Sequence, residues 1–179
     1  MKRLALLVTM LLAAGCGSDV EGQPQPQPKR NELGPATSAC PMPITFQLLD
    51  GWRGVRQTLK TRQGDVLCQM LLGPTMDAGS LRIYRVTGTA DSKAALEPLS
   101  DVLPGAENKV YQQVPVTAGT ATELTYVINW GDRLTKSSML AVPYRDGVVV
   151  LQIMGESNAA AYEASIKAYE QAKNTVTLT

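Results

Sequence analysis

The N-terminus most constrains what this chain can fold into, because it decides the compartment in which the rest of the chain folds. A basic start is followed by a short uncharged apolar run, Leu4–Leu12, and small residues lead from there to Cys16. This order of basic, apolar and small residues is typical of a cleaved export signal. A transmembrane helix needs about 20 apolar residues, so the run is too short to span a bilayer. The sequence predicts that residues 1–15 are a signal peptide.

The segment Leu12-Ala13-Ala14-Gly15-Cys16 resembles the bacterial lipobox, with Ala13 where leucine is commonest. The resemblance implies that Cys16 is lipidated, becomes the new N-terminus and holds the mature protein on a membrane. Two or three acyl chains, at about 0.8 kcal/mol per buried methylene, anchor a protein far more firmly than one chain. The expected location is the extracytoplasmic face of the cell membrane, which is a partner through the lipid on Cys16. The alternative is an ordinary secretory signal in which Cys16 lies near the cleavage point by chance.

The charges argue against a nucleic-acid partner. Once Lys2 and Arg3 leave with the signal, 15 basic and 16 acidic residues remain. Proteins that bind nucleic acid concentrate their basic residues on one face, whereas those of this chain are scattered. We expect the one local cluster to be a solvated strand or loop; it consists of Arg53, Arg56, Lys60 and Arg62.

The residue types also argue against an enzyme. The chain contains no histidine, which removes histidine general bases, Ser-His and Cys-His nucleophile pairs and the commonest metal ligand. The patterns Gly-x-Ser-x-Gly, Ser-x-x-Lys, His-Glu-x-x-His and the phosphate-binding loop are also missing. A glycosidase could use a pair of carboxylates, but the aspartates near predicted turns most often serve the backbone. We expect no catalytic residue, no metal site and no cofactor.

Two cysteines remain besides Cys16. In an exported protein, Cys40 and Cys68 are most simply a structural disulfide. Closing a loop of about 29 residues would stabilise the fold by about 3–4 kcal/mol. The alternatives are two buried free thiols or a redox pair, although a redox pair usually has Cys-x-x-Cys spacing.

Composition divides the mature chain in two. Residues 16–39 repeat Gln-Pro and contain almost nothing to bury, which predicts a tether. Residues 40–179 are expected to form a single domain, since this length supports one core.

Alternating apolar residues and turn signals predict an antiparallel meander. Gly131-Asp132 and Arg145-Asp146-Gly147 are expected hairpin turns. The run 66–72 is continuously apolar, so we expect it to be buried on both faces, and 148–154 to be central. The predicted strands cover residues 44–48, 55–60, 66–72, 81–86, 109–116, 123–130, 134–144 and 148–154.

Two helices are expected. One covers residues 92–103, with Asp91 as its N-cap and Pro98 inside, where proline should kink or restart it. The other follows Ser157 or Asn158, and its predicted sheet-facing stripe is Ala159, Tyr162, Ile166, Tyr169 and Lys173. The fold class predicted is α+β, a largely antiparallel sheet of about six strands packed by two helices.

The same elements resemble the LpqN/LpqT family of actinobacterial lipoproteins, whose domain belongs with the PsbP-like α/β sandwiches. The likeness implies an envelope location, interaction with envelope components and no established catalytic set. The cysteine pair and the Gln-Pro tether depart from the family. The residues that carry the likeness are Asp50-Gly51-Trp52-Arg53, Leu103-Pro104-Gly105, Thr122 to Trp130, Asp146-Gly147-Val148-Val149-Val150-Leu151-Gln152 and Thr175-Val176-Thr177.

Two functions follow as expectations. The first is a non-catalytic binding or accessory module of the cell envelope, whose partners are envelope proteins or lipids. The second is a carrier or sensor that holds a small apolar or lipid ligand between sheet and helices. An enclosed cavity would favour the carrier, and a filled interior with an exposed apolar patch would favour the module. The candidate ligand-binding residues are Trp52, Tyr126, Trp130, Tyr162 and Tyr169.

Overall fold

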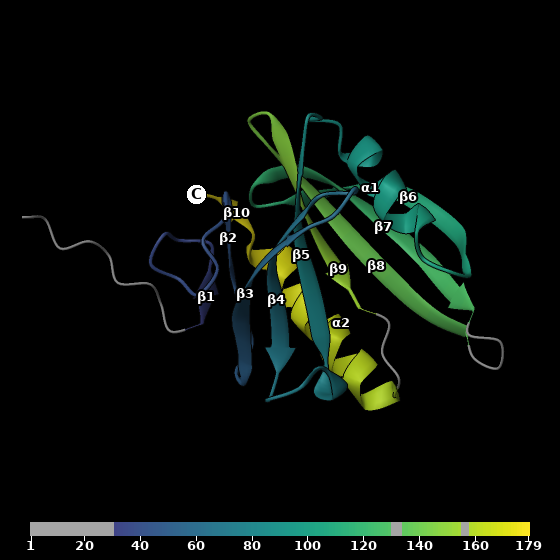
Figure 1. Cartoon of the computed structure of the whole chain (residues 1–179), viewed down its shortest axis with the longest axis horizontal. Coiled ribbons are helices and arrows are strands. Elements are labelled where there is room, and N and C mark those ends of the chain that lie inside the picture. The colour runs from purple at the N-terminus through teal and green to yellow at the C-terminus, as the bar shows by residue number, and fades with distance from the viewer. Residues whose placement is uncertain (1–30, 130–133, 155–157) are drawn as a thin grey trace, which may run out of the picture.

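A seven-stranded antiparallel sheet is the centre of the fold, one strand more than predicted (Figure 1). It is seen in a computed structural model that describes residues 31–129, 134–154 and 158–179. In the order β3-β4-β5-β9-β8-β7-β6, two meanders meet where β5 pairs with β9. The strands are β3 (Trp52–Lys60), β4 (Asp65–Leu72), β5 (Ser80–Thr87), β6 (Ala106–Val116), β7 (Gly119–Asn129), β8 (Leu134–Tyr144) and β9 (Gly147–Ile153).

A second, small sheet joins the two ends of the described chain. It consists of β1 (Glu32–Leu33), β2 (Ile44–Gln47) and β10 (Thr177–Leu178). The N-terminal segment and the C-terminus therefore lie side by side (Figure 1). The folded part thus begins before the predicted domain start at residue 40, because Leu33 is buried and its strand pairs with β2. A two-residue strand in a Pro- and Gly-containing segment is too short to show a period in the sequence.

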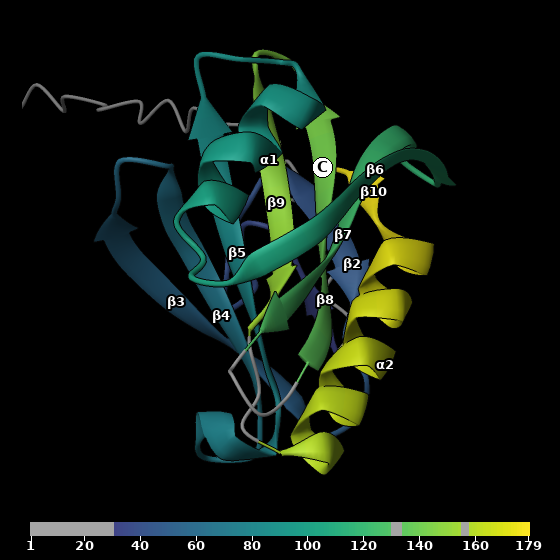
Figure 2. The ribbon, with the colours of Figure 1, turned by 90° about the vertical axis from the view of Figure 1, so that its right-hand side faces the viewer.

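The two faces of the large sheet are covered by different elements. One core cluster packs α1 (Ser92–Asp101) against β7, β8 and β9, and the other packs α2 (Ala159–Thr175) and the small sheet against the opposite face. Alternate residues of β9 enter the two clusters, Val150 the first and Leu151 the second. Figure 2 shows the helices well apart, with strands of the sheet between them.

The burial of the strands confirms one expectation and corrects another. Strand β9 lies in the middle of the sheet and all of its residues are buried, as predicted. Strand β4 is not buried on both faces: its residues alternate between buried and half-buried. Helix α1 packs on β7, β8 and β9, whereas β4 lies farther along the sheet, next to the edge strand β3. The helix therefore leaves one face of β4 partly open.

Helix α1 begins as predicted and stays unbroken. The Asp91 Oδ1 accepts hydrogen bonds from the backbone N–H groups of Lys93 and Ala94, at 2.9 and 3.3 Å. Pro98 lies inside the helix, which continues through it to Asp101, so of the two expected effects the restart does not occur. Its ring is exposed, while Leu96 and Leu99 are buried beside it, so packing holds the helix across the missing hydrogen bond.

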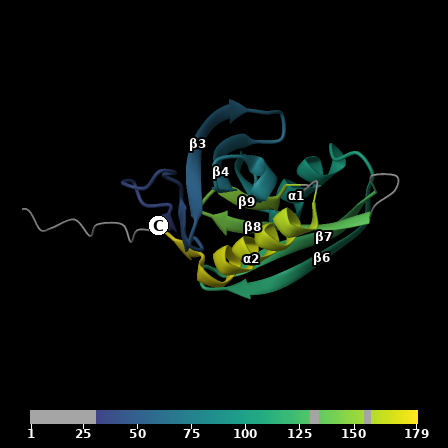
Figure 3. The same ribbon diagram turned by 90° about the horizontal axis from the view of Figure 1, so that it is seen from below.

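Helix α2 is capped by Asn158, whose Oδ1 accepts from the Ala161 N–H at 2.8 Å. Its buried face differs from the predicted stripe: Ala159 is exposed, and Tyr162 and Ile166 are only half-buried. Small side chains let the helix approach the sheet closely, so Tyr162 and Ile166 lie along its flank. Figure 3 shows α2 running alongside strands of the large sheet. The buried residues of α2 are Ala161, Ser165, Ala168, Tyr169 and Ala172.

Candidate functional site

The predicted ligand-binding aromatics do not share one cavity. Tyr126 is 2% exposed and packs in the cluster covered by α1, whereas Tyr169, 1% exposed, packs in the cluster covered by α2. Trp52 is also buried, in the α2 cluster. Trp130 lies outside the described residues, as does Cys16. Among the described aromatics, these three are therefore core residues.

Tyr162 has a different environment. It lines an open pocket of about 320 Å³ between α2 and strands β7 and β8, together with Ile166 and Tyr126. Lys136 also lines this pocket, so its wall is not purely apolar. Burial raises the pKa of the Tyr162 hydroxyl, with the nearby Glu163 adding to the shift. Of the candidate residues that the structure describes, only Tyr126 and Tyr162 line the same pocket.

Cys40 and Cys68 form a disulfide, with their Cα atoms 5.8 Å apart. Both residues are buried, at 1% and 0% exposure. The bond ties the N-terminal segment to the middle of β4, so the expected disulfide is confirmed over the alternative of two free thiols.

A buried carboxylate on β7 gathers three donors. Glu123 is 4% exposed, and its Oε1 accepts a 2.9 Å hydrogen bond from the Tyr169 hydroxyl. The Lys173 Nζ lies 2.9 and 3.0 Å from the two carboxylate oxygens, and Gln112 Nε2 donates to Oε2 at 2.9 Å. We call Glu123, Tyr169, Lys173 and Gln112 the Glu123 cluster. It links strands β6 and β7 to α2.

Hydrogen bonding keeps Glu123 ionised. Burial alone would raise the pKa of this carboxyl, but the hydrogen bonds from Lys173, Gln112 and Tyr169 outweigh burial and lower it. The Tyr169 pKa is raised well above its ordinary value, first by burial and then by the adjacent Glu123 charge. A carboxylate held by three donors and a protonated tyrosine are arranged to fasten α2, not to exchange protons with a substrate.

The sequence patterns missed the Glu123 cluster. Glu123 and Lys173 are 50 residues apart, and neither stands in a motif. The available signal was the alternation in β7, which carries apolar residues on one face and Glu123 on the other. Such a pattern predicts that the face with the glutamate is exposed, unless a helix covers it. Here α2 covers it.

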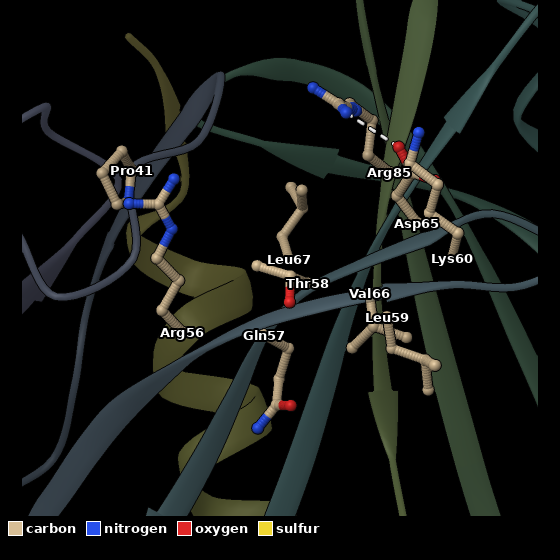
Figure 4. Close-up of a pocket in the computed structure, with 10 residues that line it drawn as sticks. All are labelled: Pro41, Arg56, Gln57, Thr58, Leu59, Lys60, Asp65, Val66, Leu67 and Arg85. Atoms are coloured by element: carbon tan, nitrogen blue, oxygen red, sulfur yellow. Dashed lines mark hydrogen bonds and ion pairs between the residues drawn. The ribbon is translucent and has the colours of Figure 1, made fainter.

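A basic pocket opens at the end of the β3–β4 hairpin (Figure 4). It measures about 250 Å³, and its charged wall consists of Arg56, Lys60, Asp65 and Arg85. The Arg85 Nη2 donates to Asp65 Oδ2 at 2.8 Å. That hydrogen bond is the main cause that holds the pKa of Asp65 below its ordinary value. We call this hollow the hairpin pocket.

The predicted basic cluster is divided by the fold. Arg56 and Lys60 line the hairpin pocket, while Arg62 lines a neighbouring pocket of about 340 Å³. Arg53 instead donates to the backbone carbonyls of the loop at Gly73 and Pro74, both at 3.2 Å. The sequence did not point to Arg85, which joins the cluster through strand pairing.

Neither a metal centre nor a membrane span is found in the described part of the chain. Within residues 31–129, 134–154 and 158–179, no group of three or more His, Cys, Asp or Glu side chains could hold a metal ion. In these same ranges, no helix has the length and apolar character to cross a membrane.

Two solved structures share the fold, which confirms the LpqN- and PsbP-like resemblance. LpqN, involved in cell envelope biogenesis of Mycobacterium tuberculosis, is 16% identical over 80% of this chain and 86% of its own, with a TM-score of 0.50. Cyanobacterial PsbP (CyanoP) from Synechocystis sp. PCC 6803 is 11% identical over 89% and 99%, with a TM-score of 0.54. At such identities the likeness establishes the fold alone.

Sequence comparison identifies a family. The profile of a family described as "Uncharacterised lipoprotein" matches residues 13–176, a range that includes Cys16. No curated protein matches the chain.

Proposed function

Because the chain belongs to the uncharacterised lipoprotein family whose profile matches residues 13–176, we propose that it is a non-catalytic binding or accessory module of the cell envelope. In this proposal acyl chains on Cys16 anchor it to the extracytoplasmic face of the cell membrane. Its partners are envelope proteins or lipids. The likeness to LpqN, which is involved in cell envelope biogenesis, supports the envelope setting.

One observation carries the proposal: the described aromatics do not enclose a common cavity, and the three pockets described above open at the surface. The aromatics expected to line a ligand cavity, Tyr126, Tyr169 and Trp52, pack in two separate cores. The hollows lie instead beside exposed charged residues such as Lys60 and Arg62. An open surface with charged groups suits recognition of a partner better than enclosure of a small ligand.

The Glu123 cluster supports a non-catalytic role. Its carboxylate is the most buried charged group described, and every oxygen already accepts from a protein donor. A general acid or base needs a proton that can reach a substrate. Glu123 is occupied in holding α2.

The second candidate function is the carrier or sensor, and the pocket beside Tyr162 favours it. Its lining includes Tyr162, Ile166 and Val127, and the 320 Å³ volume is at the lower end of ligand sites. Its opening to solvent is the feature that makes it the weaker candidate.

Photo-crosslinking in intact cells tests the proposal. When benzoylphenylalanine replaces the exposed Thr58 on β3, it should capture an envelope component. The control carries benzoylphenylalanine in place of the exposed Glu163 on α2. A reproducible adduct at position 58 and none at 163 would support the module. A third variant carries benzoylphenylalanine in place of Tyr162. A lipid adduct of this variant, with no adduct at position 58, would favour the carrier instead.

A further inference from the structure

We propose that the hairpin pocket binds anionic lipid headgroups of the membrane that anchors this chain. The inference names a ligand class for the binding module proposed above and rests on that proposal. It is carried by the charges that the pocket collects, by an exposed leucine at its rim and by the position of the N-terminal segment.

The pocket has a surplus of positive charge. Arg56, Lys60 and Arg85 line it against a single carboxylate, Asp65, which leaves a net charge of +2. Asp65 is already paired with Arg85 at 2.8 Å. Across the described residues, no ion pair is formed by Arg56 or Lys60. The two cations are therefore available to an anion, and Figure 4 shows them on either side of the pocket.

Arg85 adds an independent observation. Its Nε is buried and forms no hydrogen bond with any described residue. Buried donors without a partner are uncommon in folded proteins. The guanidinium is held in the pocket wall by its hydrogen bond to Asp65, and its other donors are given to no protein acceptor among the described residues.

The apolar rim selects a membrane rather than a free anion. Leu59 is 57% exposed, next to Lys60 in the strand and part of the same pocket. Surfaces that dock on bilayers combine basic residues with apolar side chains that enter the interface. A soluble phosphate would gain nothing from Leu59.

The position of the N-terminal segment brings the pocket within reach of the bilayer. Pro41, from the segment that follows the anchor, forms one wall. About 15 residues separate Cys16 from Asn31, which limits the separation of the two to about 50 Å even if the chain is fully extended. Anchoring thus keeps the pocket at a high effective concentration of headgroups.

Vesicle co-sedimentation of the mature chain, prepared unacylated with Cys16→Ser, tests the inference. The chain should bind vesicles that contain phosphatidylglycerol and not vesicles of phosphatidylcholine alone. Arg56→Gln/Lys60→Gln should weaken binding about 25-fold, the product of about fivefold for each cation. The matched control, Lys93→Gln/Lys167→Gln, loses the same charge at exposed sites on the helices and should bind nearly as well as the parent.

Equal weakening in the two double variants would overturn the inference, because it would mean general attraction without a site. Displacement from the vesicles by low millimolar inorganic phosphate would also overturn it, since the pocket would then take a free anion. Leu59→Gln should weaken vesicle binding in the expected case. All variants are first compared by thermal melting, which identifies any loss of fold. If the vesicle experiment overturns this inference, the crosslinking experiment still tests the proposed binding module independently.

Discussion

Glu123 is the residue on which the attachment of the last helix depends. Its carboxylate accepts from Tyr169 and Lys173 on α2 and from Gln112 on β6. Removing one partner of a buried ion pair leaves the other charge uncompensated, which costs more than the pair itself contributes. The cluster is therefore a sensitive point for stability.

We predict that Glu123→Gln lowers the free energy of unfolding by about 2–3 kcal/mol. The loss stays below that of a fully buried pair because the Lys173 side chain keeps 18% exposure. Urea denaturation measures it. Lys93→Gln, which breaks the exposed pair between Lys93 and Glu97, should change the value by no more than about 0.5 kcal/mol. Similar losses in the two variants would contradict the role assigned to Glu123.

The same residue should make stability depend on pH. The folded-state pKa of Glu123 lies below the ordinary value of 4.5, so its contribution is complete above that pH and is lost as pH falls through the folded value. Tyr169 acts at the other end: its pKa is raised above 10.0, so stability falls as pH rises beyond 10.

Denaturation midpoints between about pH 6 and pH 3 should therefore fall less steeply in Glu123→Gln than in the parent chain. The Asp65–Arg85 pair is half-buried and remains in both proteins, so it cancels in this comparison. Parallel curves would show that Glu123 does not carry the acid dependence.

At the scale of elements, the disulfide holds the N-terminal segment on the sheet. Cys40 follows β1 in the chain and Cys68 lies in β4, and a side chain at Gly54 on the neighbouring β3 would meet Leu33 and the Cys40 Sγ. The segment, the disulfide and β3 are thus packed with no room for a larger residue at position 54. Covalent attachment compensates for the brevity of β1.

We predict that Cys40→Ala/Cys68→Ala lowers the free energy of unfolding by about 3–4 kcal/mol. A nonspecific protease should then cut between residues 31 and 43 first, since only the short pairing of β1 with β2 and the burial of a few side chains would still hold the segment. Cys16→Ala should leave both the melting temperature and the digestion pattern unchanged. Early cleavage elsewhere in the double variant would contradict the local role of the bond.

The elements also show how far sequence patterns reach. Period-2 alternation and turn residues predicted every strand of the large sheet, because each signal lies within a few neighbouring residues. The predicted buried face of α2 was wrong, because the prediction placed large residues such as Tyr162 and Ile166 against the sheet. Ala161, Ala168 and Ala172 carry the buried face, and only the distance between helix and sheet favours small side chains there.

At the scale of the whole molecule, the anchor and the domain act together. Cys16 lies outside the described residues, and membership of the lipoprotein family supports its lipidation. The N-terminal segment supplies β1 of the small sheet and Pro41 of the hairpin pocket. The chain therefore enters the fold beside the candidate binding surface.

Cys16→Ala should move the protein from the membrane fraction to the soluble extracytoplasmic fraction or leave it as an uncleaved precursor. Mass spectrometry of the parent protein should find Cys16 at the N-terminus with added acyl mass. The Cys40→Ala/Cys68→Ala variant is the control and should stay in the membrane fraction. A mature N-terminus at another residue would contradict the lipid anchor.

Local order along the chain was sufficient for the cysteine pair, the hairpins and the fold class, and it predicts the export signal and the lipobox. These features depend on residues close in sequence, or on residue types that are rare enough to pair by elimination. Tertiary structure alone decided that β5 pairs with β9, that Leu33 enters the core and that Lys173 reaches Glu123. Such contacts join residues at no fixed spacing, so they exist only once the two meanders and the last helix pack together.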